Sequence, residues 1–226
     1  MTQELLSFDH ELMQWFNAPH LHTLALDQFF YAVSKIFIWL PTFALLLYTI
    51  TKTKKRESIL IIIGIVLVFL ITDRITSGLM KPVFARPRPS HDPAIMDMLA
   101  YAFNYRGGAY GFPSSHAGNS FAIATFLTML FRNRTLGITI FSWAVICSYS
   151  RMYLGVHFPS DIFVGATLGT LFGWFSFWFY SKVLKSKFPK LACDDEFSPS
   201  QIKALCYCLA AQIFTIASVS VILKQM

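Results

Sequence analysis

Residues 150–161 bring a guanidinium, an imidazole and a carboxylate close together in the chain, on Arg151, His157 and Asp161. Arg151 can hold an oxyanion with its planar fork of N–H donors. His157 can act as a nucleophile or carry a proton near neutral pH. If a helix begins just after His157, Asp161 lies one turn further on, within reach of the imidazole ring. The spacing indicates a nucleophile with a carboxylate that orients it, and a structural ion pair is the alternative.

Two further clusters carry groups of a similar kind. Residues 81–89 contain two cations that can bind an anion, Lys81 and Arg88. Residues 113–116 stand directly before an apolar run and supply two hydroxyls and a second imidazole, on Ser114, Ser115 and His116. A helix N-terminus at this point offers unpaired N–H groups that suit a phosphate. Phosphoryl transfer needs this combination of an anion clamp, a nucleophile and an acid for the leaving oxygen.

The composition is that of a membrane protein. Of the 226 residues, 55% are hydrophobic and 14% are charged, and the mean hydropathy is +0.52. These values exclude an ordinary soluble domain and favour a chain that crosses the bilayer several times. The net charge of +7 then reflects membrane topology and an anionic substrate, and no nucleic-acid partner is expected. The four cysteines show no Cys-x-x-Cys spacing, so neither zinc nor a disulfide framework is expected, and no cleaved signal peptide is indicated.

The apolar runs predict an all-α membrane bundle of about six transmembrane helices. They lie at about residues 28–50, 58–80, 117–131, 136–150, 162–180 and 202–223. Pro41 predicts a kink in the first run. Asp73 and Arg74, adjacent and opposite in charge, predict a buried structural ion pair in the second. Residues 1–27 place apolar and acidic positions at helical spacing, which predicts an interfacial amphipathic helix or, alternatively, a packed extramembrane helix.

Basic residues are distributed unevenly among the predicted loops. Residues 1–34 hold no Lys or Arg, whereas ten lie in three loops, at 51–57, 132–135 and 181–201. The positive-inside rule puts these three loops in the cytoplasm. The long polar connection at 81–116 and the stretch at 150–161 are then expected to share the outer face of the cytoplasmic membrane.

The chain resembles the type 2 phosphatidic acid phosphatase family, which is related to the vanadium haloperoxidases, in three motifs. These are Lys-x6-Arg-Pro at 81–89, Pro-Ser-x-His at 113–116 and Ser-Arg-x5-His-x3-Asp at 150–161. The resemblance covers about residues 25–185 and leaves a C-terminal loop and span, 186–226, outside the motif-bearing core. It implies a single integral-membrane phosphatase domain over residues 1–226, a phosphohistidine intermediate and no metal or other cofactor.

The resemblance also implies a role for each matched residue. His157 would attack phosphorus, Asp161 would orient it, and His116 would protonate the leaving group and later activate water. The phosphate oxygens would be bound by Lys81, Arg88, Ser114, Ser115 and Arg151. The family often carries glycine where Ser115 stands, so a positive φ at this position would strain the serine.

Two more cations in the long connection, Arg86 and Arg106, are candidates for contacts with the substrate's headgroup. They could hold a second phosphate through charge-assisted hydrogen bonds, and solvated loop charges are the alternative. For this reason, and because the chain has no extra soluble domain to recognise a large headgroup, undecaprenyl diphosphate is the favoured substrate.

Other functions fit the same residues. Lipid A, phosphatidylglycerol phosphate and phosphatidic acid are alternative substrates for the same phosphate clamp. A lipid or anion transporter is the alternative from another class, but the polar residues cluster at one face and no internal repeat is visible. A haloperoxidase-like oxidant enzyme is disfavoured by the hydrophobic spans.

Overall fold

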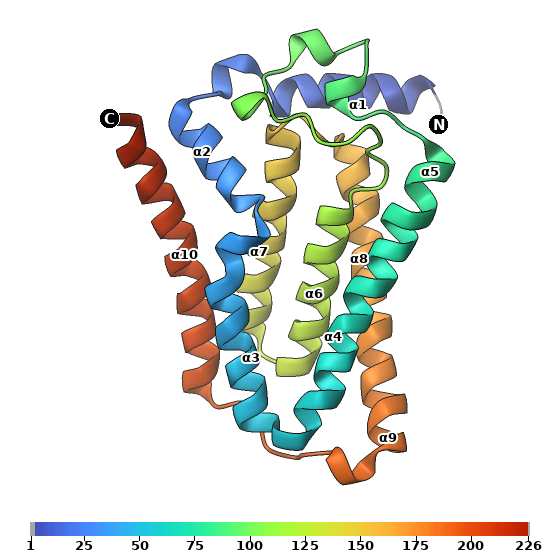
Figure 1. Ribbon diagram of the computed structural model, residues 1–226, viewed down its shortest axis with the longest axis vertical. Helices are drawn as coiled ribbons and strands as arrows, with labels where there is room; N and C mark the ends of the chain where they lie inside the picture. Colours follow the sequence, from blue (N-terminus) through green and yellow to red (C-terminus); the bar gives the residue numbers. More distant parts are fainter. Residues whose placement is uncertain (1–2, 226) are drawn as a thin grey trace.

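The computed structural model describes residues 3–225 (Figure 1), and the predicted domain extends beyond them to residues 1, 2 and 226. Within the described residues the fold is helical and contains no strand, which confirms the all-α prediction. The long helices are α3 (Leu40–Lys54), α4 (Ser58–Asp73), α6 (Ser115–Phe131), α7 (Arg134–Tyr153), α8 (Pro159–Trp178) and α10 (Pro199–Gln225). Shorter ones are α1 (Gln3–Phe16), α2 (Leu24–Val33), α5 (Lys81–Phe84) and α9 (Lys185–Lys187).

Helix α6 is the centre of the bundle and packs against α4, α7 and α8. Its contact with α8 is close because small residues face one another there. The α8 glycines recur at four-residue intervals, and a Cβ at Gly169 would lie 2.2 Å from the Gly118 carbonyl oxygen. Only glycine therefore permits this backbone separation, which sets the first turn of α6 against the middle of α8.

Within the described residues, three helical stretches are long and apolar enough to cross a membrane: Ile36–Phe84, Pro159–Lys187 and Pro199–Leu223. The first reverses direction at Lys55, whose φ is +42°, so it forms two antiparallel rods, α3 and α4–α5. Helix α6 is mostly buried among the other helices, so it needs less apolar surface than a helix that faces lipid. The helical membrane protein is thus confirmed, and the count of six spans stays a prediction.

The first predicted span, 28–50, is interrupted. Helix α2 ends at Val33, a 3-10 turn covers Ile36–Trp39, and α3 begins at Leu40. The kink predicted at Pro41 was wrong, because this proline occupies the first turn of α3. A first-turn proline loses no intrahelical hydrogen bond, so it starts the helix here and does not bend it.

The buried ion pair predicted for Asp73 and Arg74 was also wrong. Both side chains are exposed, and Asp73 instead accepts a hydrogen bond from Asn119 Nδ2 at 3.1 Å. Consecutive residues on a helix point about 100° apart, so adjacent opposite charges do not face each other.

Helix α1 lies across the end of the bundle, beside the long connection of residues 85–114 (Figure 1). One side of α1 is buried through Asp9, Met13 and Asn17, while Phe8 and Trp15 on the other side are exposed. The helix is therefore packed on protein along one face, and its exposed surface is mixed, with Glu4 and Glu11 beside the two aromatic side chains. Its predicted interfacial position stays a prediction.

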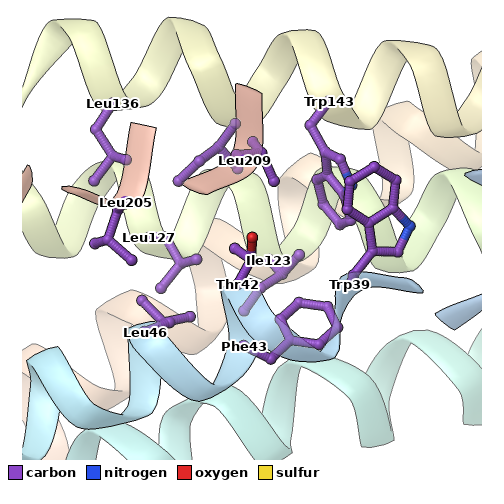
Figure 2. Close-up of a pocket in the computed structure, with 11 residues that line it drawn as sticks. Trp39, Thr42, Phe43, Leu46, Ile123, Leu127, Leu136, Trp143, Leu205 and Leu209 are labelled. Carbon is purple, nitrogen blue, oxygen red and sulfur yellow. The ribbon is translucent and has the colours of Figure 1, made fainter. Parts of the chain in front are cut away.

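Apolar side chains fill the space between α10 and the rest of the bundle. Figure 2 shows Trp39, Thr42 and Phe43 of the α3 region opposite Leu205 and Leu209 of α10. They border a cavity of about 40 Å³ that carries no ionisable lining residue. This cavity is therefore part of the packing and not a site for phosphate chemistry.

Candidate active site

The end of the bundle that carries α1 is also the end at which α6 and α8 begin (Figure 1). His157 lies in the turn between the end of α7 at Tyr153 and the start of α8 at Pro159. Helix α6 starts with Ser115 at the same end, and the connection of residues 85–114 crosses it. All three motifs therefore meet, as the sequence predicted.

His157 is held between a donor and an acceptor on opposite sides of its ring. The side chain is 1% exposed. Arg88 Nη1 lies 3.1 Å from Nε2, and Asp161 Oδ2 lies 3.4 Å from Nδ1. Because a guanidinium can only donate, Nε2 is the accepting nitrogen and the proton sits on Nδ1, facing the carboxylate. This is the tautomer that a nucleophilic Nε2 requires.

The surroundings of His157 also keep its ring neutral. Burial lowers the pKa of His157 well below its ordinary value, and the positive charges of Arg88, Arg151 and Lys81 lower it further. The imidazole is therefore unprotonated at Nε2 at neutral pH. A nucleophile needs this free lone pair.

Asp161 is fully buried and uses both of its carboxylate oxygens. Oδ2 accepts a hydrogen bond from the Phe158 N–H at 2.9 Å, and Oδ1 accepts one from Arg86 Nη1 at 2.8 Å. The Asp161 carbonyl accepts from the Ser114 N–H at 3.0 Å, which ties α8 to the start of α6. A Cβ at Gly111 would lie 2.9 Å from Oδ2, so the long connection can pass this close to the carboxylate because residue 111 is glycine. Asp161 is thus fixed through both carboxylate oxygens and through its backbone carbonyl.

Arg88 and Arg151 form a pair of buried guanidinium groups, 9% and 2% exposed. Arg88 Nη1 donates to the Val156 carbonyl at 2.9 Å, and Arg151 Nη2 donates to the Tyr105 hydroxyl at 3.1 Å. The Nε atoms of both arginines are buried without a hydrogen-bond partner. Burial and then the charge of Arg151 lower the pKa of Arg88. Buried like charges with unpartnered donors are costly alone, and an oxyanion would relieve both costs.

The two serines are already engaged by the protein. Ser114 is the N-cap of α6, and its hydroxyl accepts from the Ala117 N–H at 3.4 Å. The Ser115 hydroxyl lies 2.9 Å from Thr76 Oγ1 and 2.7 Å from Ser77 Oγ. Ser115 starts α6 and is not among the residues with positive φ, so the strain expected for a non-glycine residue is absent.

Lys81 and His116 are the remaining residues that the sequence predicted for the site. Lys81 Nζ lies 3.5 Å from the Ser77 hydroxyl, and the charges of Arg88 and Arg151 act on both Lys81 and His116. His116 is exposed, in contrast to the buried His157. The two imidazoles therefore differ: one is enclosed and fixed, and the other can exchange protons with water.

The two candidate headgroup contacts lie elsewhere. Arg86 is buried and bonded to Asp161, Ser160 and Asp9, with its guanidinium 4.1 Å from the centre of the Phe158 ring. Arg106 is exposed, and its guanidinium lies 4.3 Å from the centre of the Tyr101 ring in the long connection. These placements favour a positioning role for Arg86 and a surface role for Arg106 over the headgroup contacts predicted from the sequence.

Sequence reasoning missed two residues of this region. Tyr105 accepts the Arg151 hydrogen bond, and its ring lies 5.5 Å from the guanidinium carbon. Asp9 comes from α1 and binds Arg86 Nη2 at 2.6 Å. No motif marks either residue. The four-residue spacing of Asp9, Met13 and Asn17 was the available signal, since it puts the acid on the same helix face as a large apolar side chain.

Comparisons with known proteins point to one family of phosphatases. The chain matches the PAP2 superfamily over residues 62–185. A lipid A 4′-phosphatase from Bacteroides thetaiotaomicron is 36% identical over 81% of this chain and 81% of its own. An undecaprenyl-diphosphatase from Sulfolobus acidocaldarius is 31% identical over 77% of this chain and 78% of its own. The crystal structure of Aquifex aeolicus LpxE superposes with a TM-score of 0.55 at 27% identity, covering 74% of this chain and 92% of that one.

The family match spans all three motifs and more than half of the chain. Both sequence relatives are phosphatases of lipid substrates, by their names. The alternatives of a transporter and of a haloperoxidase-like oxidant enzyme are thereby set aside. The chain belongs to the PAP2 superfamily and is an integral-membrane phosphoric ester hydrolase.

Proposed function

We propose that this protein removes a phosphate group from the glycolipid lipid A, with His157 as nucleophile, at the outer face of the cytoplasmic membrane. The observation that carries the proposed chemistry is the enclosed His157, whose accepting Nε2 faces Arg88, next to a second buried guanidinium. A phosphate bound by Arg88 and Arg151 would have its phosphorus within reach of Nε2.

The first step transfers the phosphoryl group to the enzyme. Arg88 moves its hydrogen bond from Nε2 to a phosphate oxygen, and Lys81 and Arg151 bind the other oxygens. The Nε2 lone pair forms the N–P bond while the bond from phosphorus to the lipid oxygen breaks. His116 gives a proton to that leaving oxygen. The ring of His157, now bonded at both nitrogens, carries a positive charge that the Asp161 carboxylate stabilises.

The second step releases inorganic phosphate. His116, deprotonated after the first step, takes a proton from a water molecule as its oxygen attacks phosphorus. The N–P bond breaks and its electron pair returns to Nε2. The exposure of His116 suits this role because water must reach it. Ser114 and Ser115 contribute through the N-terminal amides of α6, since their hydroxyls are held by the protein.

The choice of lipid rests on two observations. The lipid A 4′-phosphatase relative matches at higher identity and over more of the chain than the undecaprenyl-diphosphatase relative. The second-phosphate argument for undecaprenyl diphosphate depended on Arg86 and Arg106, and Arg86 is taken up by two carboxylates. A single phosphate clamp suits a phosphomonoester, so lipid A replaces undecaprenyl diphosphate as the favoured substrate.

The assay is phosphate release by purified protein in detergent with EDTA present, because no proposed step uses a metal. The substrates are lipid A, undecaprenyl diphosphate, phosphatidylglycerol phosphate and phosphatidic acid. We expect the highest kcat/KM for lipid A, and a loss of at least about a thousandfold for His157→Ala. His91→Ala, which removes an exposed imidazole from the long connection, is the matched control and should keep its activity.

Each part of the proposal has its own contrary result. A preference for undecaprenyl diphosphate would replace the substrate and leave the nucleophile intact. Substantial turnover by folded His157→Ala would overturn the nucleophile. Loss of wild-type activity in EDTA that Mg²⁺ restores would overturn the metal-free scheme.

A further inference from the structure

The buried face of α1 is unusual because it carries polar groups. Asp9 is 1% exposed, and Met13 and Asn17 follow it at four-residue intervals, both fully buried. The Asn17 side chain accepts from the Ala100 N–H at 2.8 Å and donates to carbonyls at the end of α7. Asn17 therefore serves as an attachment point for α1, which leaves the buried charge of Asp9 to be explained.

Asp9 is the outer member of a row of charges that ends at the nucleophile. Asp9 Oδ2 accepts from Arg86 Nη2 at 2.6 Å. Arg86 Nη1 donates to Asp161 Oδ1 at 2.8 Å, and Asp161 Oδ2 faces His157 Nδ1 at 3.4 Å. The signs alternate, and the three charged side chains are nearly or fully buried. Charges in such a dry row act on one another strongly.

The row is held rigidly at its middle. The Arg86 guanidinium lies 4.1 Å from the centre of the Phe158 ring and also donates to Ser160 Oγ at 2.7 Å. Asp9 Oδ1 accepts from the Ser160 N–H at 3.0 Å, in the first turn of α8. Asp9 and Arg86 thus both hold the first turn of the helix that carries Asp161.

The alternation of charge has a chemical consequence. Arg86 alone would neutralise Asp161 and weaken its support for a positively charged His157 ring. Asp9 draws the guanidinium toward itself and offsets that effect. The carboxylate of Asp161 then keeps enough negative charge to stabilise the imidazolium that forms on phosphoryl transfer.

We propose that Asp9 is a positioning residue of the active site, which together with Arg86 sets the orientation and effective charge of Asp161 and, through it, the reactivity of His157. This inference rests on the proposed role of His157 as nucleophile. It assigns the N-terminal helix, which lies outside the three motifs, a part in the chemistry.

The proposal predicts opposite electrostatic effects for two substitutions. Asp9→Asn removes a negative charge, so the His157 ring becomes harder to protonate and less nucleophilic. Arg86→Gln removes a positive charge, so the ring becomes easier to protonate. The measurement is an NMR pH titration of histidine-labelled protein, in which His157→Ala identifies the His157 resonances. We expect the pH at the midpoint of the His157 titration to be lower in Asp9→Asn and higher in Arg86→Gln than in wild type.

The kinetic expectation separates positioning from substrate binding. Both variants should lose at least about tenfold in kcat, with KM within about twofold of wild type, because neither residue contacts the phosphate. Asp9→Glu, which keeps the carboxylate, should recover part of the loss.

Asp92→Asn is the matched control. It removes the charge from another polar contact of α1, that between Asp92 and His10 at 3.0 Å, and Asp92 is not part of the row of charges. It should lower the melting temperature and leave kcat unchanged.

The outcomes are distinguishable from failure of the proposed function. A wild type that releases phosphate from no lipid, or an active His157→Ala, would refute the function itself. An active wild type in which Asp9→Asn and Arg86→Gln leave the His157 midpoint unmoved would refute the positioning role. So would a kcat loss in Asp9→Asn no larger than that in Asp92→Asn. If Asp9→Asn does not fold, Asp9→Glu decides the question, because a displaced carboxylate that leaves both kcat and the His157 midpoint at their wild-type values would refute the positioning role.

Discussion

At the scale of single residues, the candidate site keeps one imidazole, that of His157, neutral among cations. His157 lies in a field of positive charge from Arg88, Arg151 and Lys81, and burial acts in the same direction. These groups disfavour a proton on Nε2 before the substrate arrives. In the proposed reaction, a bound phosphate brings negative charge to the same place, so the ring can accept positive charge as the N–P bond forms.

The buried neutral state of His157 predicts a pH dependence of stability. Its folded pKa lies below its unfolded value of about 6.5, so the unfolded chain binds the extra proton first as the pH falls. The contribution of the neutral His157 to the free energy of unfolding is therefore complete above about pH 6.5 and is lost progressively as the pH falls below that value. Asp161 faces Nδ1, and the cations Arg88, Arg151 and Lys81 together with His116 act on the ring from the other sides.

The measurement is the melting temperature in phosphate-free detergent buffer between about pH 5 and pH 8. We expect wild type to lose more stability on acidification than His157→Asn, which cannot take up the proton. His91→Asn, at an exposed histidine, is the control and should follow wild type. Parallel curves for wild type and His157→Asn would contradict the buried neutral state.

The sequence predicted these residues well where local spacing decided their position. The four-residue interval from His157 to Asp161 is set by the first turn of a helix, and the structure has that turn. It predicted Arg86 less well, because a cation in a polar loop gives no sign of its partner. That partner, Asp9, is 77 residues away in the chain, and only the docking of α1 brings them together.

At the scale of elements, the site depends on the contact between α6 and α8. Helix α6 begins at Ser115, and α8 carries Asp161 in its first turn. Their starts are joined by one hydrogen bond, from the Ser114 N–H to the Asp161 carbonyl. The glycine spacing on α8 allows the two backbones to approach closely in the turns that follow. The distance between α6 and α8 therefore determines how far His116 stands from His157.

Enlarging one of these glycines should open the site. A Cβ at Gly169 would meet the Gly118 carbonyl oxygen at 2.2 Å, which requires the helices to move apart. We expect Gly169→Ala to cost about 1–3 kcal/mol of stability, typical of overpacking, and to lower kcat as well. Gly78→Ala is the control, since a Cβ there lies 3.9 Å from its nearest neighbour. Equal stability of the two variants in thermal unfolding would contradict the close contact.

Element boundaries were predicted best where polar residues interrupt apolar runs. The start of α4 and the ends of α7 and α8 follow from such interruptions, whereas the predicted second span ran past the end of α4 at Asp73. The break before α3 falls at Ser34 and Lys35, and it was missed because these two polar residues were read as part of one long apolar run over residues 28–50. The packed face of α1 was open to either interpretation, since an amphipathic pattern fits a membrane surface and a protein surface equally.

At the scale of the whole molecule, the two ends of the bundle differ in charge and in chemistry. The lower end in Figure 1 carries the turn at Lys55–Glu57, the start of α7 and the short helix α9. These segments contain five of the ten loop lysines and arginines counted from the sequence, and the other five lie within three residues of them. The opposite end holds the long connection, α1 and the turn between α7 and α8, which contains His157. The positive-inside rule then predicts that the chemical end faces outward.

This orientation can be tested in intact cells with single cysteines in a background where the four native cysteines are replaced. Ser186→Cys lies in α9 at the basic end, and Asp97→Cys lies in the long connection; both positions are exposed, and neither substitution touches the candidate site. We expect an impermeant thiol reagent to label position 97 in intact cells and position 186 only after the cells are opened. The physical reason is the cost of moving the basic loops across the membrane, which fixes them on the cytoplasmic side. Labelling of position 186 alone in intact cells would invert the bundle, and phosphate would then be released into the cytoplasm.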